Sequence, residues 1–255
     1  MPLSADSYYA QISAGAAELA DLLDSNSPEL HIPTCPDWTL RQLATHVGRA
    51  HRWAAEIVRT RAARPIPFRE VPDGALPAEQ SQRGPWLRAG AGLLVESVRR
   101  ADDEPLWTFI GSMPAGFWAR RMSHETLVHL ADAQIAAGEQ VAMDPVLAAD
   151  AIDEWLAISG PNPGSPDARA HALPAGAVLH LHTTDPGIGN GEWLITNRAD
   201  GIVIEPGHGK GDAALTGPAQ SLLLVLLRRL PPADPSVTLY GDQAILTAWL
   251  DSTPF

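Results

Sequence analysis

Cysteine is almost absent from this sequence, since Cys35 is the single cysteine among its 255 residues. One cysteine cannot form an intramolecular disulfide, which excludes the disulfide frameworks of small secreted domains. Long apolar runs are also lacking: the longest extends from Leu222 to Leu227, whereas a membrane-spanning helix needs about 20 apolar residues. The first residues show neither the basic nor the apolar segment of a signal peptide. These absences predict a cytoplasmic protein without a membrane partner.

Basic residues are few as well. Lys and Arg number 18 against 30 Asp and Glu, which gives a net charge of −12. Nucleic acids and anionic membranes attract basic surfaces, so neither is an expected partner. Hydrophobic residues make up 45% of the chain, which is enough for a substantial core in one large domain or two ordinary ones. We expect small-molecule partners, and the composition leaves the oligomeric state open.

The first part of the chain has the periodicity of helices, with apolar residues three and four positions apart. The pattern predicts helices over residues 6–23, 39–61, 86–102, 123–138 and 144–159. Ser123 is the expected N-cap of the fourth helix. The segments 64–85 and 103–120 are predicted to be long loops that shape a pocket. Helices of this length with apolar stripes favour a four-helix bundle.

The pattern changes after a Pro- and Gly-rich segment at about residues 160–167, which we interpret as a linker. Beyond it, alternating and β-branched segments predict strands over 177–183, 192–196, 201–205 and 237–240, and apolar segments predict helices over 219–230 and 242–250. The sequence therefore predicts a helical domain over residues 1–160 and a smaller α+β domain over residues 168–255.

Glu125 and His129 are four positions apart in a predicted helix. At about 100° per residue they differ by about 40° around the helix axis, so both project from one face, as ligands of a divalent metal ion would. His124 and His129 are five positions apart, about 140° around the axis, and so do not form the His-Glu-x-x-His pattern of metalloproteases. The alternative is an amphipathic helix on which Glu125 and His129 are merely solvated.

A metal ion bound by this pair needs a further protein ligand, which in a bundle comes from a facing helix. His46 lies on the apolar stripe of the second predicted helix and fits that role. His51 follows five residues later and points well away from His46. The alternative is that His46 is a core histidine with satisfied hydrogen bonds.

Two segments resemble a known family. The run from Thr34 to His46 resembles the "C-P-x-W-(T/S)-(V/L)-x-x-L-x-x-H" segment of the mycothiol-dependent maleylpyruvate isomerase family, and Ser123 to His129 resembles its "E-x-x-x-H" segment. Residues 179–255 resemble the smaller α+β domain of that family, which is related to sterol-carrier-protein-like folds. The resemblance covers almost the whole chain, and it implies a DinB-like four-helix bundle followed by a smaller C-terminal α+β domain.

The resemblance implies that His46, Glu125 and His129 are the protein ligands of a zinc ion, the same set that the helix spacing suggests. Two histidines and one carboxylate leave coordination positions open, which is typical of a catalytic zinc site. Asp132 follows His129 by three residues and would orient that ligand.

In the family, mycothiol binds zinc as a thiolate, adds to the double bond of maleylpyruvate, permits rotation and is then eliminated. The resemblance implies such an isomerase, with zinc and mycothiol as its cofactor and cosubstrate. Two alternatives remain open: a mycothiol S-transferase, in which the sulfur stays on the product, and a non-catalytic module that binds a metal or a small molecule.

The family also uses an arginine of its C-terminal domain to hold the dianionic substrate. Arg229 is the best match to that position, and Arg228 stands where the family pattern usually has Gly. A guanidinium suits a carboxylate because it can donate two parallel hydrogen bonds. The alternative is that both arginines favour the C-terminus of a helix and face solvent.

Other candidates carry less weight. His180 and His182 share one face of a predicted strand and could reach a ligand cavity, but polar strand faces often hold histidine. The Gly-rich segment 207–211 lacks the length and order of a phosphate-binding P-loop, which favours a tight turn. Cys35 lies in a Pro-punctuated segment and is interpreted as structural.

Overall fold

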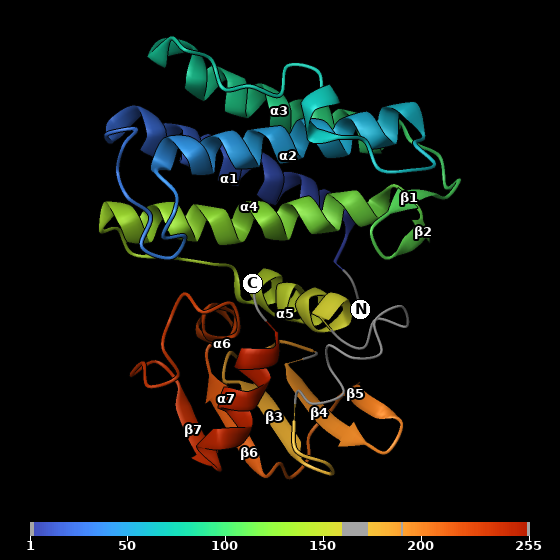
Figure 1. Ribbon diagram of the computed structural model, residues 1–255, viewed down its shortest axis with the longest axis vertical. Helices are drawn as coiled ribbons and strands as arrows, with labels where there is room; N and C mark the ends of the chain where they lie inside the picture. The colour runs from blue at the N-terminus through green and yellow to red at the C-terminus, as the bar shows by residue number, and fades with distance from the viewer. Residues whose placement is uncertain (1–2, 160–172, 190, 254–255) are drawn as a thin grey trace. The chain divides into compact units, whose positions relative to one another are not determined.

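The structure is a computed structural model that describes residues 3–159, 173–189 and 191–253 (Figure 1). The chain forms two compact units, one of residues 3–142 and one that begins at Met143. This division falls before the expected linker at residues 160–167, which lies outside the described residues. Helix α5 (Pro145–Ser159) therefore belongs to the second unit, where it packs against a helix of that unit, and not to the predicted domain 1–160.

The first unit is built on long helices that form a bundle (Figure 1). They are α1 (Ala5–Ser25), α2 (Leu40–Thr60), α3 (Gln80–Arg100) and α4 (Gly116–Ala137). Both α1 and α2 pack on α3 and α4. Their apolar stripes meet in a core that includes Ile12, Leu19, Leu43, Leu94 and Trp118, all fully buried. This confirms the predicted helical bundle.

The segment that leads into α2 has a fixed shape. The Thr39 side chain accepts a hydrogen bond from the Gln42 backbone, and Gln42 bonds back to the Thr39 backbone, which forms a capping box. Before it, the Ile32 N–H donates to the Trp38 carbonyl over 3.0 Å and closes a small loop. Residues 33–38 are therefore held in place at the start of the helix that carries His46.

Helix α4 begins at Gly116, seven residues before the expected N-cap Ser123. Ser123 is fully buried in the middle of the helix, so its interpretation as a cap was wrong. The first turns of α4 place Trp118 and Met122 in the core, four residues apart, and this apolar spacing extends the helix upstream. The proline at position 114 had suggested a loop as far as residue 120.

The remaining predicted loops also contain structure. Residues 103–115 include the antiparallel hairpin of β1 (Leu106–Thr108) and β2 (Gly111–Met113). Residues 64–79 include a short 3-10 helix, η1 (Phe68–Glu70), and α3 starts six residues earlier than expected, with Pro85 inside it. The proline and glycine residues of these segments therefore predicted less regular secondary structure than the segments contain.

The second unit contains a sheet with the strand order β5-β4-β3-β6-β7. Its strands are β3 (Val178–Thr183), β4 (Glu192–Arg198), β5 (Gly201–Pro206), β6 (Ala213–Gly217) and β7 (Thr238–Gly241). Strands β3 and β6 are parallel, and the other neighbours are antiparallel. The sequence analysis missed β6, because a short run of two alanines followed by Leu-Thr-Gly carries little β-branched or aromatic signal.

Helices α6 (Ala219–Leu226) and α7 (Gln243–Ser252) pack on β3 and β6. Leu179 and Leu181 of β3 are fully buried, and the alternation along the strand gives His180 and His182 the opposite face. Helix α6 ends at Leu226, earlier than the predicted residue 230, because Arg228 adopts the left-handed region with φ 62°. Within the described residues, no helix is long and apolar enough to cross a membrane.

Candidate functional site

The three predicted metal ligands lie together in the bundle. Helix α2 supplies His46, and helix α4 supplies Glu125 and His129. Glu125 Oε1 is 2.8 Å from His46 Nε2 and 3.3 Å from His129 Nε2. All three donor atoms lie within 4.8 Å of one another. The four-residue spacing on α4 and the packing of α2 against it therefore produce one convergent group.

The group is buried on one side and open on the other. The side chains of His129 and Glu125 are 5% and 14% exposed, whereas that of His46 is 35% exposed. A molecule can therefore approach from the side of His46, while α4 shields the rest from water. This asymmetry suits a site that takes up a small ligand.

Arg121 forms an ion pair with Glu125 one helical turn later in α4. The guanidinium bonds Glu125 Oε2, which leaves Oε1 for the two histidines. Burial raises the pKa of Glu125, but the Arg121 charge and the two imidazoles outweigh it and hold that pKa well below its usual range. Glu125 is therefore anionic at neutral pH. The sequence analysis missed Arg121, although its spacing of four from Glu125 is the signal of such a pair.

Asp132 orients His129 from behind. Asp132 is fully buried, its Oδ2 is 2.9 Å from His129 Nδ1, and Thr34 Oγ1 donates to its Oδ1 over 2.6 Å. The Nδ1–H bond directs Nε2 toward Glu125, an arrangement typical of metal-binding histidines. Burial lowers the pKa of His129, but Asp132, the Cys35 side chain and Glu125 together raise it by more than burial lowers it. The pKa of His129 therefore lies well above its usual value. The spacing of Asp132 from His129 had suggested this contact.

Cys35 lies beside the same carboxylate, with Sγ 3.6 Å from Asp132 Oδ2. Cys35, His129 and Asp132 form a second group whose donor atoms lie within 4.8 Å of one another. Because the His129 Nδ1–H bonds Asp132, the imidazole offers its Nε2 to the group that contains His46 and Glu125. The interpretation of Cys35 as a structural residue did not foresee its position next to a candidate ligand.

The Trp38 ring packs against the imidazole rings of His46 and His129. Its ring centroid is 4.9 Å from that of His46 and 5.8 Å from that of His129. An indole in this position keeps water away from one side of the group and limits the rotation of both imidazoles. Trp38 belongs to the motif that ends at His46, but the sequence analysis assigned it no role.

The other histidines of the bundle are not part of this group. His124 is buried against the Tyr8 ring, with centroids 6.0 Å apart. His51 is fully buried and bonds Thr126 Oγ1 over 2.8 Å. Burial lowers the pKa of His51 to about 4. Both side chains therefore lie apart from the group of His46, Glu125 and His129.

The donor set fits a first-row divalent metal ion such as zinc. Zinc with tetrahedral bonds of about 2.0–2.1 Å separates its ligand atoms by about 3.3 Å. The 3.3 Å between Glu125 Oε1 and His129 Nε2 equals that value, and the 2.8 Å to His46 Nε2 is a hydrogen-bond length that is shorter than it. Three protein ligands also leave room for one exchangeable ligand.

Arg229 lies in the second unit, just beyond the end of α6. Its side chain is largely buried, and its Nη1 donates to the Leu227 carbonyl over 2.8 Å. Arg228 precedes it with φ 62°, in the left-handed region that favours glycine. Arg228, where the family pattern usually has Gly, therefore has a backbone conformation that suits Gly.

Comparisons with known proteins cover most of the chain. Residues 9–134 match the family model described as mycothiol maleylpyruvate isomerase N-terminal domain, and residues 146–248 match the MDMPI C-terminal domain. Two solved structures of mycothiol-dependent maleylpyruvate isomerase, one of them a mutant, are similar with TM-scores of 0.60 and 0.56. Their identities are 14% and 15%, over 94% of this chain and 95% of theirs, which shows a shared fold. Comparison with curated protein sequences finds no match.

Proposed function

Because this chain belongs to the mycothiol maleylpyruvate isomerase family, we propose that it is an enzyme that uses mycothiol to act on a small electrophile. The proposed reaction is a cis–trans isomerisation like that of maleylpyruvate. The observation that carries the proposal is the convergence of His46, Glu125 and His129, with Asp132 behind His129. These are the ligand positions that the family resemblance implies.

His46, Glu125 and His129 would hold a zinc ion, which when bound lowers the pKa of a coordinated thiol and keeps it as a thiolate at neutral pH. Glu125 contributes one negative charge to this group, and Arg121 balances that charge from the opposite carboxylate oxygen. Asp132 fixes the tautomer and the orientation of His129.

The reaction itself needs no net oxidation. The mycothiol sulfur adds to one carbon of the substrate double bond, which leaves a single bond about which the molecule rotates. Elimination of the same sulfur then restores the double bond in the trans geometry and returns the thiol. Trp38 protects this chemistry by covering one side of the two histidines and excluding water.

We further propose that Arg229 binds a carboxylate of the substrate, because Arg229 is the best match to the arginine position of the family. A planar guanidinium can form two parallel hydrogen bonds to a carboxylate, which a lysine cannot. Arg229→Lys should therefore raise KM more than it lowers kcat, whereas Arg228→Lys, the matched control, should change neither. Equal KM values for Arg229→Lys and the unsubstituted enzyme would exclude this role.

Metal analysis tests the site. Each of the variants His46→Ala and Glu125→Gln, purified without a tag or chelator, should contain one equivalent of divalent metal less than the unsubstituted protein. His31→Ala is the control, because His31 is exposed and lies outside the group. If the two ligand variants retain as much metal as the unsubstituted protein, the assignment is wrong.

Calorimetry and product analysis test the reaction. Mycothiol should bind the metal-loaded protein with release of a proton, and equal binding to metal-free protein would contradict the thiolate mechanism. With maleylpyruvate present, the trans isomer should accumulate and mycothiol should be recovered unchanged. A product that retains the sulfur would instead identify a mycothiol S-transferase, and no conversion of any electrophile would identify a binding module.

A further inference from the structure

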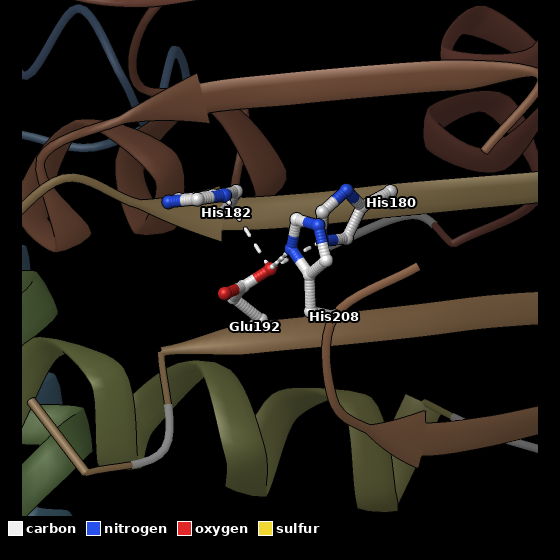
Figure 2. A group of neighbouring side chains, drawn as sticks. All are labelled: His180, His182, Glu192 and His208. Atoms are coloured by element: carbon white, nitrogen blue, oxygen red, sulfur yellow. Dashed lines mark hydrogen bonds and ion pairs between the residues drawn. The ribbon is translucent and has the colours of Figure 1, made fainter. Parts of the chain in front are cut away.

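A second group of possible metal ligands lies in the C-terminal unit, on the sheet face opposite Leu179 and Leu181. It consists of His180 and His182 of β3, Glu192 of β4 and His208, which follows β5 (Figure 2). Figure 2 shows the three imidazoles around the Glu192 carboxylate. One donor atom from each residue lies within 4.8 Å of all the others.

The strand pairing explains why these residues meet. His180 and His182 are two positions apart and so project from the same face of β3. Glu192 is the direct partner of His182 in the antiparallel β3–β4 ladder. Neighbouring strands lie about 4.8 Å apart, so these paired side chains are in contact. The register thus fixes three of the four residues without help from a loop.

A glycine-rich turn brings in His208. The Gly207 N–H donates to the Glu192 carbonyl over 3.0 Å, which ties the turn to β4 beside the carboxylate. Gly207 has φ 140°, a value that side-chain-bearing residues rarely adopt. At Gly211, an added Cβ would lie 2.4 Å from the Ala213 carbonyl oxygen and 3.1 Å from His180 Cβ. Glycines are therefore needed to fold residues 207–211 closely over the strands.

The donor atoms of the group lie close enough together to share one metal ion. Glu192 Oε2 is 2.7 Å from His208 Nδ1, 2.9 Å from His180 Nε2 and 3.4 Å from His182 Nδ1. The ligand atoms of a tetrahedral zinc site are about 3.3 Å apart. The ring centroids of the histidines are also evenly separated, at 5.6, 5.7 and 6.2 Å.

Hydrogen bonding to Glu192 accounts for two of the three imidazoles. His180 Nε2 and His208 Nδ1 bond Glu192 Oε2 over 2.9 and 2.7 Å, which occupies the roughly two lone-pair sites of that oxygen and leaves His182 Nδ1, 3.4 Å away, outside the hydrogen-bonded pair. A cation placed among the four atoms would instead use a lone pair from each of them. Three imidazoles and one carboxylate are the ligands that zinc, cobalt, nickel and related ions prefer.

We propose that His180, His182, Glu192 and His208 bind a divalent first-row transition-metal ion, independently of the bundle site. The ion would link β3, β4 and the 207–211 turn. The side chain of His208 is 77% exposed and that of Glu192 is 28% exposed, so the ion can exchange with solvent. A hollow of about 200 Å³, lined in part by Thr183, Glu192 and His208, adjoins the group and leaves space for water or a small ligand on the metal.

Metal titration of the full-length protein tests this proposal. Tag-free, chelator-treated protein is titrated with Zn²⁺ by calorimetry and with Co²⁺ by visible absorption, and bound metal is counted after dialysis. The unsubstituted protein should bind about two equivalents. His182→Ala and His208→Ala should each lose one equivalent, with a loss of affinity larger than the about 10- to 100-fold that follows loss of an outer-shell partner.

Two controls separate ligand loss from general effects. Lys210→Ala lies in the same turn and His31→Ala removes an exposed histidine elsewhere, so both variants should keep two equivalents. Both ligand variants change side chains with substantial exposure, and circular dichroism should show an unchanged fold.

The pattern of loss also distinguishes the two sites. His46→Ala should remove one equivalent and leave the sheet site intact. A total of one equivalent that disappears in His46→Ala, or unchanged binding in both His182→Ala and His208→Ala, would overturn the proposal for the sheet. Loss in the sheet variants with no loss in His46→Ala would support it and contradict the bundle assignment.

Discussion

The bundle group of His46, Glu125 and His129 and the sheet group of His180, His182, Glu192 and His208 combine the same residue types in different surroundings. The bundle carboxylate is paired with Arg121 and largely buried, and His129 is fixed by a buried carboxylate. The sheet carboxylate is more exposed, and an exposed histidine on a turn completes its group. Burial and contacts from neighbouring side chains, rather than residue type, therefore distinguish the group proposed for catalysis from the group proposed to hold an ion.

The largest difference should appear when the same substitution is made in the two carboxylates. In metal-free protein, Glu125→Gln removes the carboxylate that pairs with Arg121 and bonds His46, and it should lower the free energy of unfolding of the bundle by about 4 kcal/mol. Glu192→Gln removes a more exposed charge and should cost about 1 kcal/mol or less. Urea denaturation followed by fluorescence measures both. Similar losses in the two variants would contradict the role given to burial.

The sequence predicted the bundle group better than the sheet group. Glu125 and His129 follow from helix periodicity, because side chains on one helical face are set by spacing, whereas His46 was placed by its position on the apolar stripe of a facing helix and by the family resemblance. His208 could not be assigned to the sheet group in this way, since its place depends on strand register and on the backbone conformation of Gly207. His180 and His182 were recognised as sharing a strand face, but their partners come from other segments.

The fold shows the same limit. Long helices and the β-branched strands were predicted from periodicity, whereas β6 was missed because its small residues give little pattern, although it lies inside the sheet between β3 and β7. The start of α4 was misplaced because Ser123 resembles a cap, and only the packing of Trp118 shows that the helix continues upstream. Local signals decide such cases only when tertiary contacts agree with them.

Acid should affect the bundle through a histidine that lies outside its metal group. The Thr126 hydroxyl donates to the Met122 carbonyl, so His51 Nε2 must carry the proton of the His51–Thr126 bond. Among the described residues, His51 Nδ1 has no hydrogen-bond partner. Burial lowers the pKa of His51 from 6.5 to about 4, so the unfolded chain takes up a proton first as the pH falls.

The contribution of neutral His51 to the free energy of unfolding is present above pH 6.5. It is lost as the pH falls toward about 4, where the loss reaches about 3 kcal/mol. The His51→Gln variant lacks this titrating imidazole. Between pH 7 and pH 4, its free energy of unfolding should therefore rise by about 3 kcal/mol relative to that of the unsubstituted protein. Denaturation curves at several pH values measure the difference. A constant difference for His51→Gln would contradict the buried, neutral state of His51.

Asp132, the buried carboxylate that bonds His129, should affect the metal affinity of the bundle group. Asp132→Asn keeps the shape of the side chain but removes the charge that orients His129. Zinc affinity at the bundle site should fall about 10- to 100-fold, while affinity at the sheet site stays the same in the same variant. Competition with a chelating dye measures both sites. Equal weakening of the two would show that the substitution acts through the whole protein rather than through His129.

The smallest expected effect concerns the turn that completes the sheet group. Gly207→Ala adds a side chain with open space around it but at φ 140°, so the cost comes from backbone strain rather than from a clash. The strain of about 1 kcal/mol should be relieved by a shift of the turn that carries His208 away from Glu192. Zinc affinity at the sheet site should therefore fall by about fivefold, the equivalent of about 1 kcal/mol, with the bundle site unchanged.

Gly189→Ala is the matched control, because Gly189 is also a loop glycine with open space around it but without the positive φ. It should leave zinc affinity unchanged. If Gly207→Ala also leaves it unchanged, His208 does not depend on the turn conformation, and the contrast between a rigid helical group and a turn-dependent sheet group fails. If Gly207→Ala weakens the bundle site instead, the two groups are coupled, and their affinities must be measured in variants that lack one group at a time.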